Sequence, residues 1–89
     1  MDVHHDKQAQ EFSAEVEGHR AELQYRLREG VMTIVHTGVP EEIGGRGVAA
    51  ELTRVALETA RSNGWKVVPA CAYAAAFMRR HPEYADLLR

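Results

Sequence analysis

The sequence has one cysteine, three prolines and no long apolar run, and each shortage narrows what the chain can be. Cys71 has no second cysteine to pair with, so an internal disulfide is excluded and a reducing cytoplasmic setting is expected. The opening residues, MDVHHDKQAQ, contain no apolar stretch of the kind that a secretory signal needs. No segment approaches the ~20 apolar residues that span a membrane. We therefore expect a cytoplasmic protein without membrane association.

The chain also lacks an excess of basic residues. Lys and Arg number 11 against 13 Asp and Glu, and no basic stripe points to nucleic acid. The 89 residues are enough for one domain, because autonomous domains usually have ~50–200 residues. Residues 1–10 are polar and aperiodic, so we expect a flexible N-terminal arm and a single domain over 11–89. The adjacent His4 and His5 are expected to be solvated, and no metal site is predicted. The expected assembly is a monomer or a weak homodimer.

The first half of the domain alternates apolar and polar residues with a period of two. This alternation covers residues 12–17 and 21–28, with a turn at Gly18-His19, and is typical of a half-solvated antiparallel hairpin. Glu29-Gly30 predicts a second turn. Residues 31–35 are almost continuously apolar, which favours a central strand.

The second half predicts two helices around one more strand. Apolar residues recur at helical spacing from about Gly47 to Asn63, and Gly64 is placed for a left-handed helix end. A short strand is predicted over 66–70, parallel to 31–37, and a last helix from Tyr73 to about His81. The order β-β-β-α-β-α indicates an α/β (α+β) fold with an antiparallel meander and one parallel βαβ unit.

The start of the long helix has no Ser, Thr, Asp or Asn to cap it. The sequence there is EEIGGRGVAA, in which Gly44, Gly45 and Gly47 surround Arg46. Free N–H groups at a helix start attract anions, and glycines let a phosphate approach the backbone closely. A glycine-rich turn capped by water is the alternative. The stretch is not a P-loop, since no GK[ST] follows, and it is a poor dinucleotide fingerprint.

This order of elements around a glycine turn resembles the GNAT superfamily of acyl-CoA-dependent N-acetyltransferases. That family carries a [Q/R]-x-x-G-x-[G/A] turn whose amides hold the pyrophosphate of CoA. Gly47-Val48-Ala49 matches its G-x-A part, while Gly44 occupies the Gln/Arg position and Arg46 follows two residues later. The resemblance implies that acetyl-CoA is the cofactor and that residues 44–49 bind it.

The likeness is closest to the very small YjdJ-type subgroup. Its pattern is similar to His36-Thr37-Gly38-Val39-Pro40, then Gly45 to Ala49, then Cys71-Ala72-Tyr73 and a late Pro82, so it covers about residues 11–88. Larger members have two further helices after the first strand and extra C-terminal strands. Those parts build most of the acceptor site and are missing from this truncated form.

The resemblance also implies roles for residues near the ends of the parallel strands. The pantetheine arm would pair with the strand containing Val35 and Thr37, and the Tyr73 hydroxyl would protonate the departing thiolate. Cys71 is a candidate nucleophile or a pocket wall, and His36 a candidate base or a structural residue. Pro69 fits either strands that splay apart for the cofactor or a simple strand end.

Three functions follow from this interpretation. The first is an N-acetyltransferase that moves an acetyl group from acetyl-CoA to an amine, either a small molecule or a protein, that the sequence does not identify. The second is a non-catalytic module that binds acetyl-CoA or CoA. The third, an interaction domain using the exposed meander, leaves the uncapped glycine turn unexplained.

Overall fold

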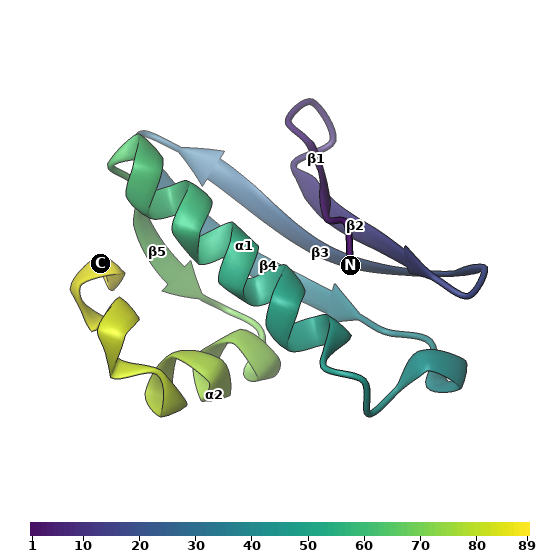
Figure 1. Cartoon of the computed structure of the whole chain (residues 1–89). Coiled ribbons are helices and arrows are strands. Elements are labelled where there is room, and N and C mark those ends of the chain that lie inside the picture. Colours follow the sequence, from purple (N-terminus) through teal and green to yellow (C-terminus); the bar gives the residue numbers. More distant parts are fainter.

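The computed structural model describes all 89 residues as a single five-stranded sheet with helices against it (Figure 1). The strands lie in chain order across the sheet. The first three pairings, between the first and the fourth strand, are antiparallel. The pairing of the fourth strand with the fifth is parallel. They are β1 (His4–Asp6), β2 (Glu11–Val16), β3 (His19–Arg28), β4 (Val31–Gly38) and β5 (Lys66–Pro69).

The two α-helices start and end close to where the sequence predicts, and two 3-10 segments that were not predicted accompany them. They are the 3-10 turn η1 (Glu41–Ile43), α1 (Val48–Asn63), α2 (Ala72–Arg80) and the 3-10 segment η2 (Pro82–Leu87). Gly64 follows α1 in the left-handed conformation, with φ of 71°, as expected for a helix end. The predicted α/β fold and its parallel βαβ unit are therefore confirmed. None of the helices is both long and apolar enough to cross a membrane.

Two tight turns set the register of the meander. Glu17 and Gly18 join β2 to β3, and Glu29 and Gly30 join β3 to β4; all four have positive φ. A two-residue hairpin turn with both residues left-handed twists in the same sense as the strands that it connects. The second turn lies where the sequence predicts it. The first lies one residue earlier than the predicted Gly18-His19, because His19 already belongs to β3.

The N-terminal arm is a correction to the sequence-based expectation. Residues 4–6 form the edge strand β1, which pairs with β2. The His5 ring stacks on Phe12 at 4.0 Å, and its Nε2 lies 2.6 Å from the hydroxyl of Tyr25. The sequence of β1 is three polar residues, which is too short and too polar to predict a strand. In the structure only its central residue is partly buried. The stack and the side-chain hydrogen bond add to the antiparallel pairing with β2 in attaching the segment to the sheet.

His5 also makes the attachment of β1 depend on pH. Burial lowers the pKa of His5, and the nearby Lys7 ammonium lowers it further. The unfolded chain then binds this proton more readily than the folded chain. The stabilisation is therefore complete above the ordinary pKa of 6.5 and is lost as the pH falls through the folded-state value. We expect the urea midpoint to fall between about pH 7.5 and about pH 5.5.

Substitution of His5 by Gln provides the control for this prediction. Gln keeps a polar group near the Tyr25 hydroxyl but does not titrate, so the fall in midpoint over that pH range should shrink. An equal fall in both proteins would assign the pH dependence to other groups.

The core lies on one face of the sheet. Every buried strand residue points to this face, where α1, α2 and η2 pack beside one another, as Figure 1 shows for α1. The strand residues that contribute are Phe12, Ala14, Ala21, Leu23, Tyr25, Met32, Ile34 and Val67. No residue of the opposite face is buried, and no helix covers it. The molecule is therefore a two-layer structure with an open sheet face.

The C-terminal residues close the outer edge of β5. Leu88 forms a parallel bridge with Val67, and the Arg89 amide donates to the Val67 carbonyl at 3.1 Å. Arg61 of α1 holds this segment through an ion pair with Asp86 at 2.8 Å. The edge strand β5 is thus partly covered.

Candidate functional site

The parallel strands β4 and β5 stop pairing at the end of β5. Their pairing stops at Ile34 opposite Pro69, and the amides of Ala70 and Cys71 both donate to the Ile34 carbonyl, at 2.9 and 3.1 Å. Beyond Ile34, β4 continues to Gly38 but pairs only with β3. Figure 1 shows β4 extending past the end of β5 toward the η1 loop. The last residues of β4 thus have one side without a strand.

A β-bulge at Val35 changes which face of the sheet the following residues of β4 point to. Tyr25 pairs with Ile34 but Gln24 pairs with His36, so Val35 is an extra residue in β4. Paired residues share a face of the sheet. Thr37, opposite buried Leu23, therefore faces the helices, whereas His36 lies on the open face.

The glycine turn leaves its backbone amides free. Gly45 and Gly47 both have φ of 76°, and Gly47 begins α1 with no side-chain cap. No hydrogen bond within the chain is made by the amides of residues 45–50; the Glu51 amide is the first that bonds, to the Gly47 carbonyl at 3.0 Å. These donors lie at the positive end of the helix dipole. The turn has the hydrogen-bonding character of an anion site.

A hollow of about 250 Å³ lies directly on this turn. Its walls are mostly backbone and small apolar side chains, with one hydroxyl-bearing residue, Tyr73 from the first turn of α2. The lining residues are Val39, Ile43, Gly44, Gly45, Gly47, Val48, Ala49, Ala50 and Tyr73. The fold therefore brings the glycine turn and Tyr73, predicted separately, to one depression.

Tyr73 keeps its proton at neutral pH. Its ring is partly buried beside Phe77, and this burial raises the pKa of the hydroxyl, while the Arg80 guanidinium acts in the opposite direction. The residue remains 37% exposed, at the edge of the hollow. It can serve as a hydrogen-bond or proton donor.

Cys71 caps the second helix. Its Sγ accepts a hydrogen bond from the Ala74 amide at 3.4 Å and lies 3.6 Å from the Thr37 hydroxyl. It thus bridges the end of β5 to the free stretch of β4. Cys71 contacts Thr37 on the helix-bearing face of the sheet, whereas His36 lies on the other face, so the two candidate residues do not meet.

His36 has a different partner, which the sequence did not reveal. Its Nε2 lies 3.9 Å from Glu22 Oε1 on the adjacent strand. Gly38 makes room for the ring, since a Cβ at that position would lie 2.9 Å from His36 Nε2. Half of the His36 side chain stays exposed.

Arg46 does not point into the hollow. Its guanidinium pairs with Glu17 of the β2–β3 turn at 2.8 Å, and both side chains are largely exposed. Hydrogen bonding to Arg46 lowers the pKa of Glu17. To bind a phosphate as predicted, Arg46 would have to leave Glu17 and pair with the phosphate instead.

Comparison with known proteins identifies the family and the fold. A family model described as GCN5-related N-acetyl-transferase matches residues 11–87. The chain belongs to this family. Protein NATD1 of the mouse is 31% identical over 98% of this chain and 84% of its own, and human NATD1 is 29% identical over 98% and 81%. The NMR structure of a GCN5-like protein from Staphylococcus aureus superimposes with a TM-score of 0.77 at 28% identity, covering 99% of this chain and 87% of that one.

The structure adds residues to the site that sequence reasoning missed. Val39 and Ile43 line the hollow because η1 folds the loop back over the turn. Their apolar character in a Pro/Gly-rich loop was the available signal. Glu22 carried no signal, because its approach to His36 depends on the register of β3 against β4. The narrower YjdJ-type likeness stays a prediction.

Proposed function

We propose that this chain is an N-acetyltransferase that moves an acetyl group from acetyl-CoA to a primary amine. The observation that carries the proposal is the run of unpaired amides at residues 45–50, at the start of a 16-residue helix and beside a hollow. An anion with several acceptor oxygens satisfies such donors, and a pyrophosphate does so best. Membership of the GCN5-related N-acetyltransferase family supports acetyl-CoA as the donor.

The gap beyond the end of β5 is the proposed place of the pantetheine arm. Residues 35–38 of β4 have no strand on that side, so an extended ligand can add there as a strand would. Val35 and Thr37 would lie along it. The arm would run from the glycine turn toward Cys71 and Tyr73, which lie at the end of β5.

The chemistry needs one donor and one acceptor of protons. The amine nitrogen attacks the thioester carbonyl carbon, the carbon–sulfur bond breaks, and the sulfur leaves as a thiolate. Tyr73 lines the hollow, and its hydroxyl would donate a proton to that sulfur. The attacking nitrogen must lose a proton in the same event.

His36 is the proposed acceptor of the amine proton. It lies on the open face of the sheet, opposite to the helices, with its Nε2 3.9 Å from Glu22 Oε1. His36 and Tyr73, the two proposed proton-transfer residues, would then lie on opposite faces of the sheet, on either side of the proposed pantetheine arm. The amine would then enter from the open face. Cys71, engaged as a helix cap, is assigned to the wall in this route rather than to a covalent acetyl-cysteine.

The second candidate function is a non-catalytic module that binds acetyl-CoA. The observation that favours it is the open sheet face, on which no helix encloses an acceptor. Both functions use the same turn, so binding alone does not separate them. Thiol release from acetyl-CoA with a panel of primary amines does: turnover supports the enzyme, and tight binding without turnover supports the module.

Titration with acetyl-CoA, followed by amide NMR shifts, tests the binding step. We expect the largest shifts at residues 45–50, smaller ones at residues 35–37 and Cys71, and none at Trp65. Free adenine without phosphates is the control and should leave the turn unshifted. An absence of shifts at the turn with millimolar acetyl-CoA would overturn the proposal.

A further inference from the structure

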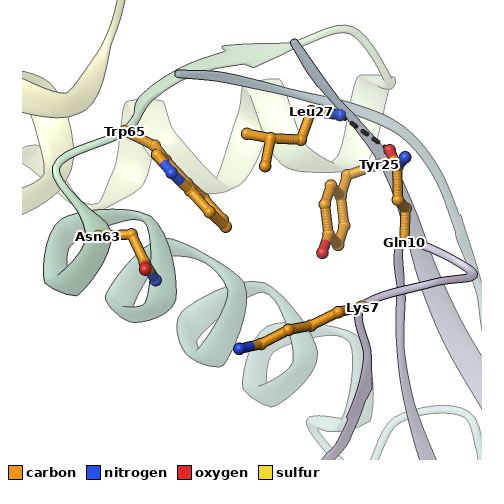
Figure 2. Close-up of a pocket in the computed structure, with 6 residues that line it drawn as sticks. All are labelled: Lys7, Gln10, Tyr25, Leu27, Asn63 and Trp65. Atoms are coloured by element: carbon orange, nitrogen blue, oxygen red, sulfur yellow. Dashed lines mark hydrogen bonds between the residues drawn. The ribbon is translucent and has the colours of Figure 1, made fainter. Parts of the chain in front are cut away.

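A second hollow lies at the other end of α1, away from the glycine turn. Its volume is about 190 Å³, and it is formed where the C-terminal end of α1 meets the β1–β2 turn and the end of β3 (Figure 2). Its lining residues are Lys7, Gln10, Tyr25, Leu27, Asn63 and Trp65. A 16-residue helix is ~24 Å long, so this hollow is separate from the proposed acetyl-CoA site.

Three of the six residues that line this hollow, Tyr25, Leu27 and Trp65, are aromatic or apolar. Figure 2 shows the Trp65 indole and the Tyr25 ring on opposite sides, with the Leu27 side chain between them. Leu27 is 36% exposed although it is apolar. A cavity of ~150 Å³ lined by apolar side chains is known to hold benzene, so this space suits one aromatic ring with a small substituent.

The polar groups around the hollow leave one strong unused donor. Gln10 accepts from the Leu27 amide at 2.8 Å, Asn63 donates to the Thr59 carbonyl at 2.8 Å, and the Tyr25 hydroxyl is bonded to His5. Lys7 takes part in none of the ion pairs of the chain. No carboxylate lines the space. The hollow therefore offers a positive charge at the edge of an apolar slot.

We propose that this hollow binds a single-ring aromatic carboxylate. The ring would lie against the Trp65 indole and the exposed Leu27 side chain, above buried Tyr25, and the carboxylate would meet the Lys7 ammonium. A ring on such a surface gains from stacking on the indole and from removal of apolar surface from water. The ammonium adds an ion pair at the rim, which selects for an anion. The site does not depend on acetyl transfer.

Benzoate is the probe that tests this site, and Trp65 is its reporter. Trp65 is the only tryptophan, so its indole N–H gives a single resolved NMR signal. We expect a saturable shift of that signal with benzoate at millimolar concentrations. Benzyl alcohol, which has the ring without the charge, should bind several-fold more weakly. Acetate, which has the charge without the ring, should give no saturable shift.

Two substitutions locate the ligand. Lys7→Gln should reduce the affinity for benzoate to that for benzyl alcohol, a change of up to ~5-fold for an exposed ion pair. Leu27→Asp should remove binding. As the control, Leu88→Asp, at another exposed leucine that lies outside the hollow, should leave binding unchanged. Equal affinities for benzoate and benzyl alcohol, or full binding in Leu27→Asp, would overturn the proposal. Acetyl-CoA affinity should be the same in both variants, so failure here and failure of the acetyltransferase proposal are distinguishable.

Discussion

Replacement of Gly47 by Asp should lower the affinity for acetyl-CoA at least ~100-fold, since like charges placed together cost several kcal/mol. The new carboxylate would lie among the free amides of residues 45–50, where the pyrophosphate is proposed to bind. It would both repel the phosphates and accept the hydrogen bonds that they need. Calorimetric titration of the two proteins measures the change.

The fold should survive this substitution. Gly47 has φ of 76°, and Asp is among the residues that tolerate the left-handed region best. A Cβ at this position would meet no atom within 4 Å. The negative charge would also lie at the positive end of the α1 dipole, which is favourable for the helix. Loss of affinity can therefore be read as an effect on the site, once urea unfolding confirms that stability is kept.

Gly30→Asp is the matched control for charge and backbone strain. Gly30 also has φ of 76° and open space around its Cβ position, but it lies in the β3–β4 turn at the opposite end of α1. It should bind acetyl-CoA as the unchanged protein does. Equal affinities of the Gly47 and Gly30 variants for acetyl-CoA would show that the pyrophosphate does not bind at the glycine turn. The proposed function would then lose its basis.

The local features of this fold were predictable because their causes are local. The spacing of apolar residues sets α1, and the glycine after Asn63 ends it in the left-handed region. The missing N-terminal cap was also visible, since it depends on which residues are present at 44–49. These signals do not require knowledge of what the helix packs against.

Features that depend on pairing between distant residues were not predictable. β1 is held by His5 against Phe12 and Tyr25, which no periodicity in a three-residue polar strand indicates. The bulge at Val35 is a property of the register between β3 and β4 and is hidden inside an apolar run. That bulge decides the faces of His36 and Thr37. The sequence could therefore name the candidate site residues, but it could not predict on which face of the sheet each of them lies.

Replacement of Tyr73 by Phe should lower kcat ~10²–10⁴-fold and leave the affinity for acetyl-CoA unchanged. Phe keeps the ring beside Phe77 and removes only the hydroxyl, so packing of α2 should be preserved. Without that donor the sulfur must leave as an unprotonated thiolate. Thiol release from acetyl-CoA with the most reactive primary amine of the panel gives kcat, and calorimetry gives the affinity.

The pH profile separates a proton donor from a residue that merely shapes the hollow. Burial raises the pKa of Tyr73 above its ordinary value of 10.0, so the hydroxyl is protonated at neutral pH and is lost as a donor only as the pH rises through that raised value. The unchanged enzyme should therefore lose activity on the alkaline side, and the Phe variant should lack this limb. Tyr25→Phe, which removes a hydroxyl from the other hollow, should keep both kcat and the limb. If Tyr73→Phe kept full turnover, the thiolate would need no protein donor. If neither protein turned over while both bound acetyl-CoA, the chain would be a binding module rather than an enzyme.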